Sequence, residues 1–252
     1  MVEIDASQLS IREINVRVRE AAEQNNEIIL LNPDARHNLC VGLTNADVHV
    51  TIRGSAGYFC AGLCDASIFD VEGNVGWAFG DNLMNGKLRV QGNAGAVCGV
   101  AMRSGSILVK GNLGSRTGQV MKGGSIVCCG NAGYRTGSML MGGTIIVLGD
   151  AREAVGEFMM DGEIYIAGDI TSLGQDAVET DFLKDDAGNI SRILGEYDIE
   201  HSGSFRKIVS DQRALRYQEY EKGELLFDES QEQKALEVAA DGNRDVMSFD
   251  SD

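Results

Sequence analysis

Cysteine is the residue type in this sequence most able to bind a metal or an iron–sulfur cluster, and the chain has six cysteines. Cys60 and Cys64 form a C-x-x-x-C pair, a poor spacing for metal ligands, and no C-x-x-C pair occurs. Cys128 falls at an inward strand position, where a free cysteine behaves as a small hydrophobic residue. We therefore expect cysteines of the core and no metal on this chain. Cys60 and Cys98 share a register and would be the first candidates if a metal were found.

The histidines do not form a recognisable catalytic grouping, and the sequence contains no nucleotide-binding loop. His37, His49 and His201 are the only histidines, and they are isolated in the sequence. The many glycines form neither a G-x-G-x-x-G fingerprint between a strand and a helix nor a Walker phosphate loop. We interpret the glycines as structural.

The glycines recur at every nineteenth position, without an insertion. A fixed period of about 20 residues is the signature of a solenoid, in which each repeat stacks on the next. Further columns follow the same period, among them the one that begins at Gly57 and the one that begins at Gly86. The main column of structural glycines is Gly54, Gly73, Gly92, Gly111, Gly130, Gly149 and Gly168.

A short strand precedes each glycine of the main column. Alternate positions are apolar in every copy, as in Ile107 and Val109 or Ile145 and Val147, so each strand has one face in a core. A G-N-x-G turn follows the strand, and we expect its asparagine to adopt the left-handed backbone of a tight corner. One strand per repeat predicts an all-β fold, a right-handed parallel β-helix of about seven coils. A second inward edge is predicted at Leu83, Met102, Met121, Leu140 and Met159.

Charged side chains on the outside of the rod are possible sites. Asp70 and Glu72 are the only acidic pair on an outward strand face; we interpret them as solvated, and a stand-alone β-helix enzyme that acts on glycans stays an alternative. Basic residues in equal register would stack like charges about 5 Å apart, which is unfavourable without an anionic partner unless the side chains splay into water. The candidate contacts for an anion or a partner are Arg103, Arg116, Lys122 and Arg135.

The outward strand face changes from polar to apolar along the rod. Its early coils carry pairs such as Thr51 and Arg53, whereas its late coils are apolar. Soluble monomers rarely leave such a patch open. We expect it to be buried, either by another subunit or by this chain's own residues 172–240. The candidate interface residues are Val127, Cys129, Ile146, Leu148 and Tyr165.

The two ends of the chain are predicted to cap the rod. Residues 1–40 should hold a capping helix over 11–24, opened by a capping box from Ser10 to Glu13, and a strand at 28–31. The β-helix should span 41–171. Residues 172–252 should form an acidic extension that is part helical and part irregular. Within it we expect loop with short ordered pieces over 174–203, helices over 211–222 and 229–240, and disorder from 243.

Charge and hydropathy limit the partners. Residues 50–170 carry 9 basic and 10 acidic side chains, while residues 171–252 carry 9 and 20. A nucleic-acid partner is not expected, because phosphate binding needs a basic footprint. The sequence shows no long apolar run and no signal-peptide pattern, so we expect a cytoplasmic protein without a membrane contact.

The glycine spacing also resembles a known family. G-x-x-G-x-x-x-G occurs at Gly92 to Gly99 and recurs at Gly111 to Gly118 and at Gly130 to Gly137. With the strand pattern, this resembles the GXGXG β-helix domain of the glutamate synthase large subunit. It is closer still to the stand-alone subunit form found in N-methylglutamate synthase. The similarity covers roughly residues 5–180 and includes G-Y-F-C-A-G at 57–62 and S-L-G-Q-D-A at 172–177.

The resemblance implies a scaffold within a hetero-oligomeric complex. In that family the β-helix packs between a class II glutamine amidotransferase and a synthase barrel that carries FMN and an iron–sulfur cluster. The catalytic groups lie on those partners, and Val2 stands where an N-terminal catalytic cysteine would be needed. The resemblance thus implies no catalytic residue and no cofactor on this chain. The β-helix subunit of formylmethanofuran dehydrogenase uses a similar repeat and is the alternative.

Overall fold

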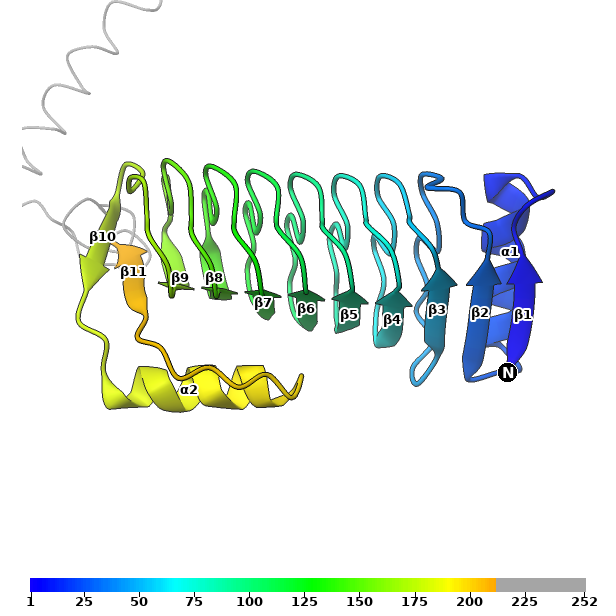
Figure 1. Ribbon diagram of the computed structural model, residues 1–252. Helices are drawn as coiled ribbons and strands as arrows, with labels where there is room; N and C mark the ends of the chain where they lie inside the picture. The colour runs from blue at the N-terminus through cyan, green and yellow to red at the C-terminus, as the bar shows by residue number, and fades with distance from the viewer. Residues whose placement is uncertain (212–252) are drawn as a thin grey trace, which may run out of the picture. The chain divides into compact units, whose positions relative to one another are not determined.

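The repeats stack side by side as parallel coils in the computed structural model, which describes residues 1–211 (Figure 1). The chain forms a parallel β-solenoid of about seven turns, so the predicted β-helix is confirmed. Apart from Asp211, the helices predicted over 211–222 and 229–240 and the disorder predicted from 243 lie outside the described residues. The elements are β1 (Val2–Asp5), α1 (Ile11–Ala22), β2 (Glu27–Leu31), β3 (His49–Arg53), β4 (Ser67–Val71), β5 (Gly86–Val90), β6 (Ser106–Val109), β7 (Ser125–Cys128), β8 (Met141–Val147), β9 (Asp161–Ile166), β10 (Ala177–Thr180), α2 (Lys184–Gly195) and β11 (Arg206–Ser210).

The period of the sequence sets the register of the sheet. From β3 to β8 each strand residue pairs with its counterpart one repeat later, as Leu88 does with Ile107 and Ile107 with Ile126. A bulge between Met141 and Thr144 is the irregularity in the pairing of β8 with β9. The predicted inward pairs are fully buried from Val50 through Ile166, and so is the second inward edge. Both apolar edges of each coil therefore belong to the core at the centre of the rod.

The asparagine column serves a purpose different from the one predicted. Asn93, Asn112 and Asn131 do not have a positive φ, so the left-handed interpretation is wrong for them. Instead, the Asn93 Oδ1 atom accepts the Asn112 amide at 2.8 Å, and Asn112 Oδ1 accepts the Asn131 amide at 2.8 Å. The ladder leaves no room for a side chain at the neighbouring glycine, since a Cβ on Gly111 would lie 2.5 Å from Asn93 Oδ1. The main glycine column therefore permits close approach of successive coils.

Helix α1 packs over the first coil of the rod. The Ser10 amide donates to Glu13 Oε2 at 2.8 Å and the Glu13 amide to Ser10 Oγ at 3.3 Å, which forms the capping box that opens α1. Ile14, Val18 and Ala22 lie one helical turn apart and are buried against the rod. The sheet also includes β1, a strand that the sequence pattern did not predict, and β1 pairs in parallel with β2.

The opposite end of the rod is more regular than the loop with short ordered pieces that we predicted over 174–203. That segment contains β10 and the twelve-residue helix α2, and the chain then returns as β11. β11 lies between β9 and β10 and is antiparallel to both. Figure 1 shows α2 running along the rod, roughly perpendicular to the direction of the strands. No helix within residues 1–211 is both long and apolar enough to span a membrane.

Candidate functional site

The late, apolar part of the outward sheet face lies beneath the chain's own α2. Val127, Ile146 and Tyr165 are fully buried there, in a cluster separate from the core inside the rod. Cys129 and Leu148 pack at the margin of this cluster and keep partial exposure. The sequence left two covers open, another subunit or residues 172–240. Among the described residues, this chain's own segment within 172–240 covers the patch, through Ile190, Ile193, Leu194 and Phe205.

A buried polar cluster anchors α2 to the sheet. Asp186 in the first turn of α2 accepts hydrogen bonds from the Tyr165 hydroxyl and from Lys207 Nζ, each at 2.7 Å to Oδ1. Its second oxygen accepts the Leu183 amide at 2.7 Å, which caps the helix. Lys207 also pairs with Glu163 at 2.8 Å. These bonds fix α2 in place, because a buried carboxylate separated from its donors would be strongly destabilising.

The protonation states follow from these contacts. Burial alone would raise the pKa of Asp186, but bonds from Lys207, the Leu183 amide and Tyr165 lower it below its usual value. Burial would lower the pKa of Lys207, but its bonds to Asp186 and Glu163 raise it. Burial and the hydrogen bond to Asp186 both raise the pKa of Tyr165. At neutral pH the cluster therefore holds a charged acid, a charged base and a neutral phenol.

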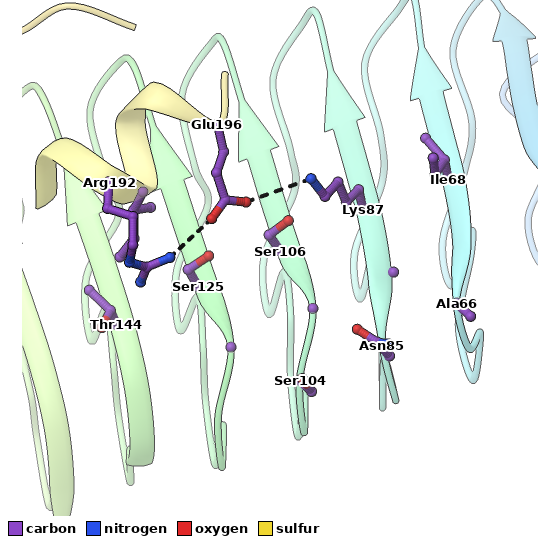
Figure 2. Close-up of a pocket in the computed structure, with 14 residues that line it drawn as sticks. Ala66, Ile68, Asn85, Lys87, Ser104, Ser106, Ser125, Thr144, Arg192 and Glu196 are labelled. Atoms are coloured by element: carbon purple, nitrogen blue, oxygen red, sulfur yellow. Dashed lines mark hydrogen bonds and ion pairs between the residues drawn. The ribbon is translucent and has the colours of Figure 1, made fainter. Parts of the chain in front are cut away.

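A groove of about 600 Å³ lies between α2 and the starts of the strands (Figure 2). Figure 2 shows Glu196, the C-cap residue of α2, between two cations, with ion pairs to Lys87 at 3.7 Å and to Arg192 at 3.1 Å. A row of hydroxyls from successive coils lies below these ion pairs, and it consists of Ser106, Ser125 and Thr144. The edge of the groove just before strands β5 and β6, called the near edge, is polar and is formed by Asn85 and Ser104.

The groove can bind a polar group but is poorly equipped to activate a nucleophile. The described residues that line it include no histidine or cysteine. Their carboxylate, Glu196, is held by Lys87 and Arg192 and not by a serine hydroxyl, which a nucleophile and its base would require. Sequence reasoning missed the groove. Its signal was the dipeptide series Gly105-Ser106, Gly124-Ser125 and Gly143-Thr144, which recurs once per coil.

The four basic candidates separate into two pairs. Arg116 donates to the Tyr134 hydroxyl at 3.2 Å and lies over the Tyr134 ring at 5.2 Å. Arg135 pairs with Glu157 at 2.8 Å. By contrast, Arg103 and Lys122 are exposed and make no side-chain hydrogen bond or ion pair within residues 1–211. The structure thus leaves Arg103 and Lys122 available to contact a partner.

The sulfur and imidazole groups lie apart from the groove. Burial raises the pKa of the Cys60 and Cys98 thiols, and it raises that of Cys64 to about 11 and that of Cys128 to about 12. Such thiols are unreactive at neutral pH. In the part of the chain that the structure describes, no cluster of three or more potential ligands could hold a metal ion. His37 stacks on Tyr58 with ring centroids 4.4 Å apart.

The outward acids are each held by a cation. Asp70 Oδ2 accepts a hydrogen bond from Arg89 Nη2 at 2.8 Å and also contacts His49 Nε2. Glu72 lies 4.0 Å from Arg53. A glycan-cleaving site needs one acid that can donate a proton and a second that stays ionised. The two acids project toward separate cations, and this arrangement does not favour the glycan-cleaving alternative.

Comparisons with known proteins give partial matches. No family model matches the chain. Protein GlxC of Rhizobium meliloti (strain 1021) is 32% identical over 87 residues, which cover 34% of this chain and 38% of GlxC. The chain thus spans well under half the length of this relative. Among solved structures, a chain of the formyltransferase/hydrolase complex (FhcABCD) from Methylorubrum extorquens, in complex with methylofuran, is similar with a TM-score of 0.47. It is 23% identical, and the match covers 60% of this chain and 67% of that chain.

Proposed function

We propose that this chain is a non-catalytic scaffold subunit of a glutamate-synthase-like complex, of the glutamate or N-methylglutamate synthase type. Its partners are a class II glutamine amidotransferase subunit and a synthase subunit that carries FMN and an iron–sulfur cluster. The proposal rests on the resemblance of the repeated G-x-x-G-x-x-x-G motif, first seen at Gly92 to Gly99, to the GXGXG domain of that family.

The observation that carries the proposal is that most thiols are buried while aromatic and methionine side chains, which favour protein contacts, are exposed. Five of the six thiols, all except that of Cys129, are buried in the rod, where burial raises the pKa of Cys60 and Cys98. The exposed corners instead carry aromatic and methionine side chains, among them Trp77 and Met139. Aromatic residues, methionine and arginine are enriched at protein interfaces. A rod that buries most of its thiols and turns aromatic and methionine side chains outward is suited to binding other subunits.

Affinity purification of the tagged full-length chain from its own cells tests the proposal. We expect it to bring down both an amidotransferase subunit and an FMN-binding subunit in fixed ratio. Partners that carry molybdenum or tungsten would instead support the formylmethanofuran dehydrogenase-type alternative. A chain that purifies alone and cleaves a glycan would overturn the scaffold proposal.

A further inference from the structure

One surface of the rod combines exposed apolar side chains with two unpaired cations. It follows a corner of the coils, where two neighbouring columns of residues face outward. The Leu63, Val120 and Met139 amides each bond to the carbonyl of the next coil, as in Met139 N to Glu157 O at 2.8 Å. We name this surface the corner strip, and it consists of Leu63, Met84, Arg103, Val120, Lys122, Met139, Met141 and Phe158.

The apolar members of the corner strip are exposed, apart from Val120, which is half-buried. Leu63 is 54% exposed, Met84 is 43% and Phe158 is 41%. With stacked coils about 4.8 Å apart, the strip extends about 24 Å along the rod. Monomeric proteins rarely leave such a stretch open, and large exposed apolar patches mark interaction sites. Methionine also adapts its shape to a partner surface.

The cations lie in the middle of the strip. The Lys122 amide bonds to the Met102 carbonyl at 2.8 Å, just as the Arg103 amide bonds to Leu83, so the two residues occupy equal positions in successive coils. Neither side chain has an ion-pair partner within residues 1–211. Met84 precedes them in the same column and Met141 follows them. Like charges stacked in this way repel each other unless an anion lies against both.

The corner strip adjoins the groove beneath α2. Asn85 and Ser104, which form the near edge of the groove, directly follow Met84 and Arg103 in the chain. A partner seated on the strip can therefore extend a polar segment toward the hydroxyl row of Ser106 and its neighbours. This continuity gives the partner a polar rim beside an apolar centre, as in many stable interfaces.

We propose that the corner strip is the docking surface for a different protein subunit, one that presents carboxylates opposite Arg103 and Lys122 and apolar side chains on either side. A second copy of this chain fits less well, because two strips that meet face to face would oppose the same cations. Two cations amid apolar residues also make too small a footprint for a nucleic acid. This inference rests on the proposed scaffold function and adds the surface and the chemistry of the partner.

Lysine acetylation footprinting of the complex purified from its own cells tests the strip directly. Acetic anhydride is applied to the full chain alone and to the complex. We expect Lys122 to be labelled at least fivefold more slowly in the complex, while the exposed Lys110, which lies off the strip and off the groove, reports the general effect of assembly. Equal labelling of Lys122 in both samples would overturn the inference, and so would a chain that purifies without any protein partner.

A charge-reversal pair separates the strip from the proposed function. The variant R103E/K122E is co-expressed with the amidotransferase and FMN-binding subunits, beside the matched variant K110E/R152E, whose exposed cations lie off the strip. We expect the first to bind these subunits at least tenfold more weakly and the second to bind like the wild type, with both equally stable alone. If the first also binds like the wild type, the strip inference fails and the scaffold proposal stands. If the wild type binds neither subunit while another protein protects Lys122 from acetylation, the scaffold proposal fails and the inference about the corner strip holds.

Discussion

The Tyr165 hydroxyl donates a 2.7 Å hydrogen bond to Asp186 Oδ1, and this bond joins the outward face of β9 to the first turn of α2. Tyr165 lies in the last coil of an apolar face that begins at Leu108, and Asp186 lies at the start of the helix that covers it. The bond shows how the chain closes its own sheet face. It also sets the position of the groove, because α2 forms one wall of it.

Replacing Asp186 with alanine should loosen this closure. The variant leaves the Tyr165 hydroxyl and the Leu183 amide without an acceptor and removes one partner of Lys207. We expect a loss of about 3 kcal/mol in the free energy of unfolding, measured by denaturant titration. Glu179→Ala is the control, since it breaks only the exposed pair with Arg206 and should cost less than about 1 kcal/mol. Equal losses in both variants would contradict the role of Asp186.

The same cluster should make the attachment of α2 sensitive to acid. The pKa of Asp186 lies below 3.8, so its contribution is present above that pH and is lost as pH falls through the lowered value. The pKa of Lys207 lies above 10.5, so its contribution is lost only as pH rises through the raised value. We expect amide-exchange protection of α2, corrected for intrinsic rates, to stay constant from about pH 5 to 9 and to fall below about pH 4, before that of β6. Loss of protection near pH 7 would argue for another anchor.

A charge placed beneath α2 should lower the stability of the isolated chain. Ile146 is fully buried there, so Ile146→Lys should cost about 3 kcal/mol, whereas Leu148→Lys at the margin should cost about 1 kcal/mol or less. Thermal unfolding of the two single variants measures this difference. The double variant should be less stable even without any partner. Full stability of the double variant would mean that α2 is not the cover of this face.

The contribution of the asparagine ladder to stability can be tested at Asn112, where an alanine variant removes the acceptor and an aspartate variant restores it. Asn112→Ala removes the acceptor of the Asn131 amide and should destabilise the chain by about 1 kcal/mol. Asn112→Asp keeps the acceptor, and Asp150 already fills the same position two coils later, where its carboxylate accepts the Asp169 amide at 2.9 Å. Denaturant titration should therefore place the Asp variant close to the wild type. An Asp variant as weak as the Ala variant would show that the amide group itself is needed.

The repeated part of the fold could be predicted from the sequence because local pattern and global packing agree there. Ile107 and Val109 alternate with outward residues, and the fixed period places each beside its counterparts in the adjacent coils. Two sources of order, strand alternation and coil stacking, thus specify the same register. The asparagine column was found for the same reason, although its role needed the hydrogen bonds of the structure.

The helix α2 could not be predicted in the same way. Its sequence contains Gly188 and Asn189, which are poor helix formers, and its N-cap is Leu183, which offers no capping side chain. Its stability comes from packing against β6 to β9 and from the contact of Asp186 with Lys207, a residue 21 positions away. The groove was missed with it, because one wall of the groove belongs to α2.

Flavin and metal content per chain tests the central claim, that this protein supports chemistry carried by other subunits. The full-length chain is purified alone and, separately, as the complex from its own cells, and both samples are measured by absorbance and by metal analysis. We expect no stoichiometric FMN, iron or zinc in the isolated chain, and both FMN and iron in the complex. Flavin bands, or a metal content near one per chain, in the isolated protein would contradict the account.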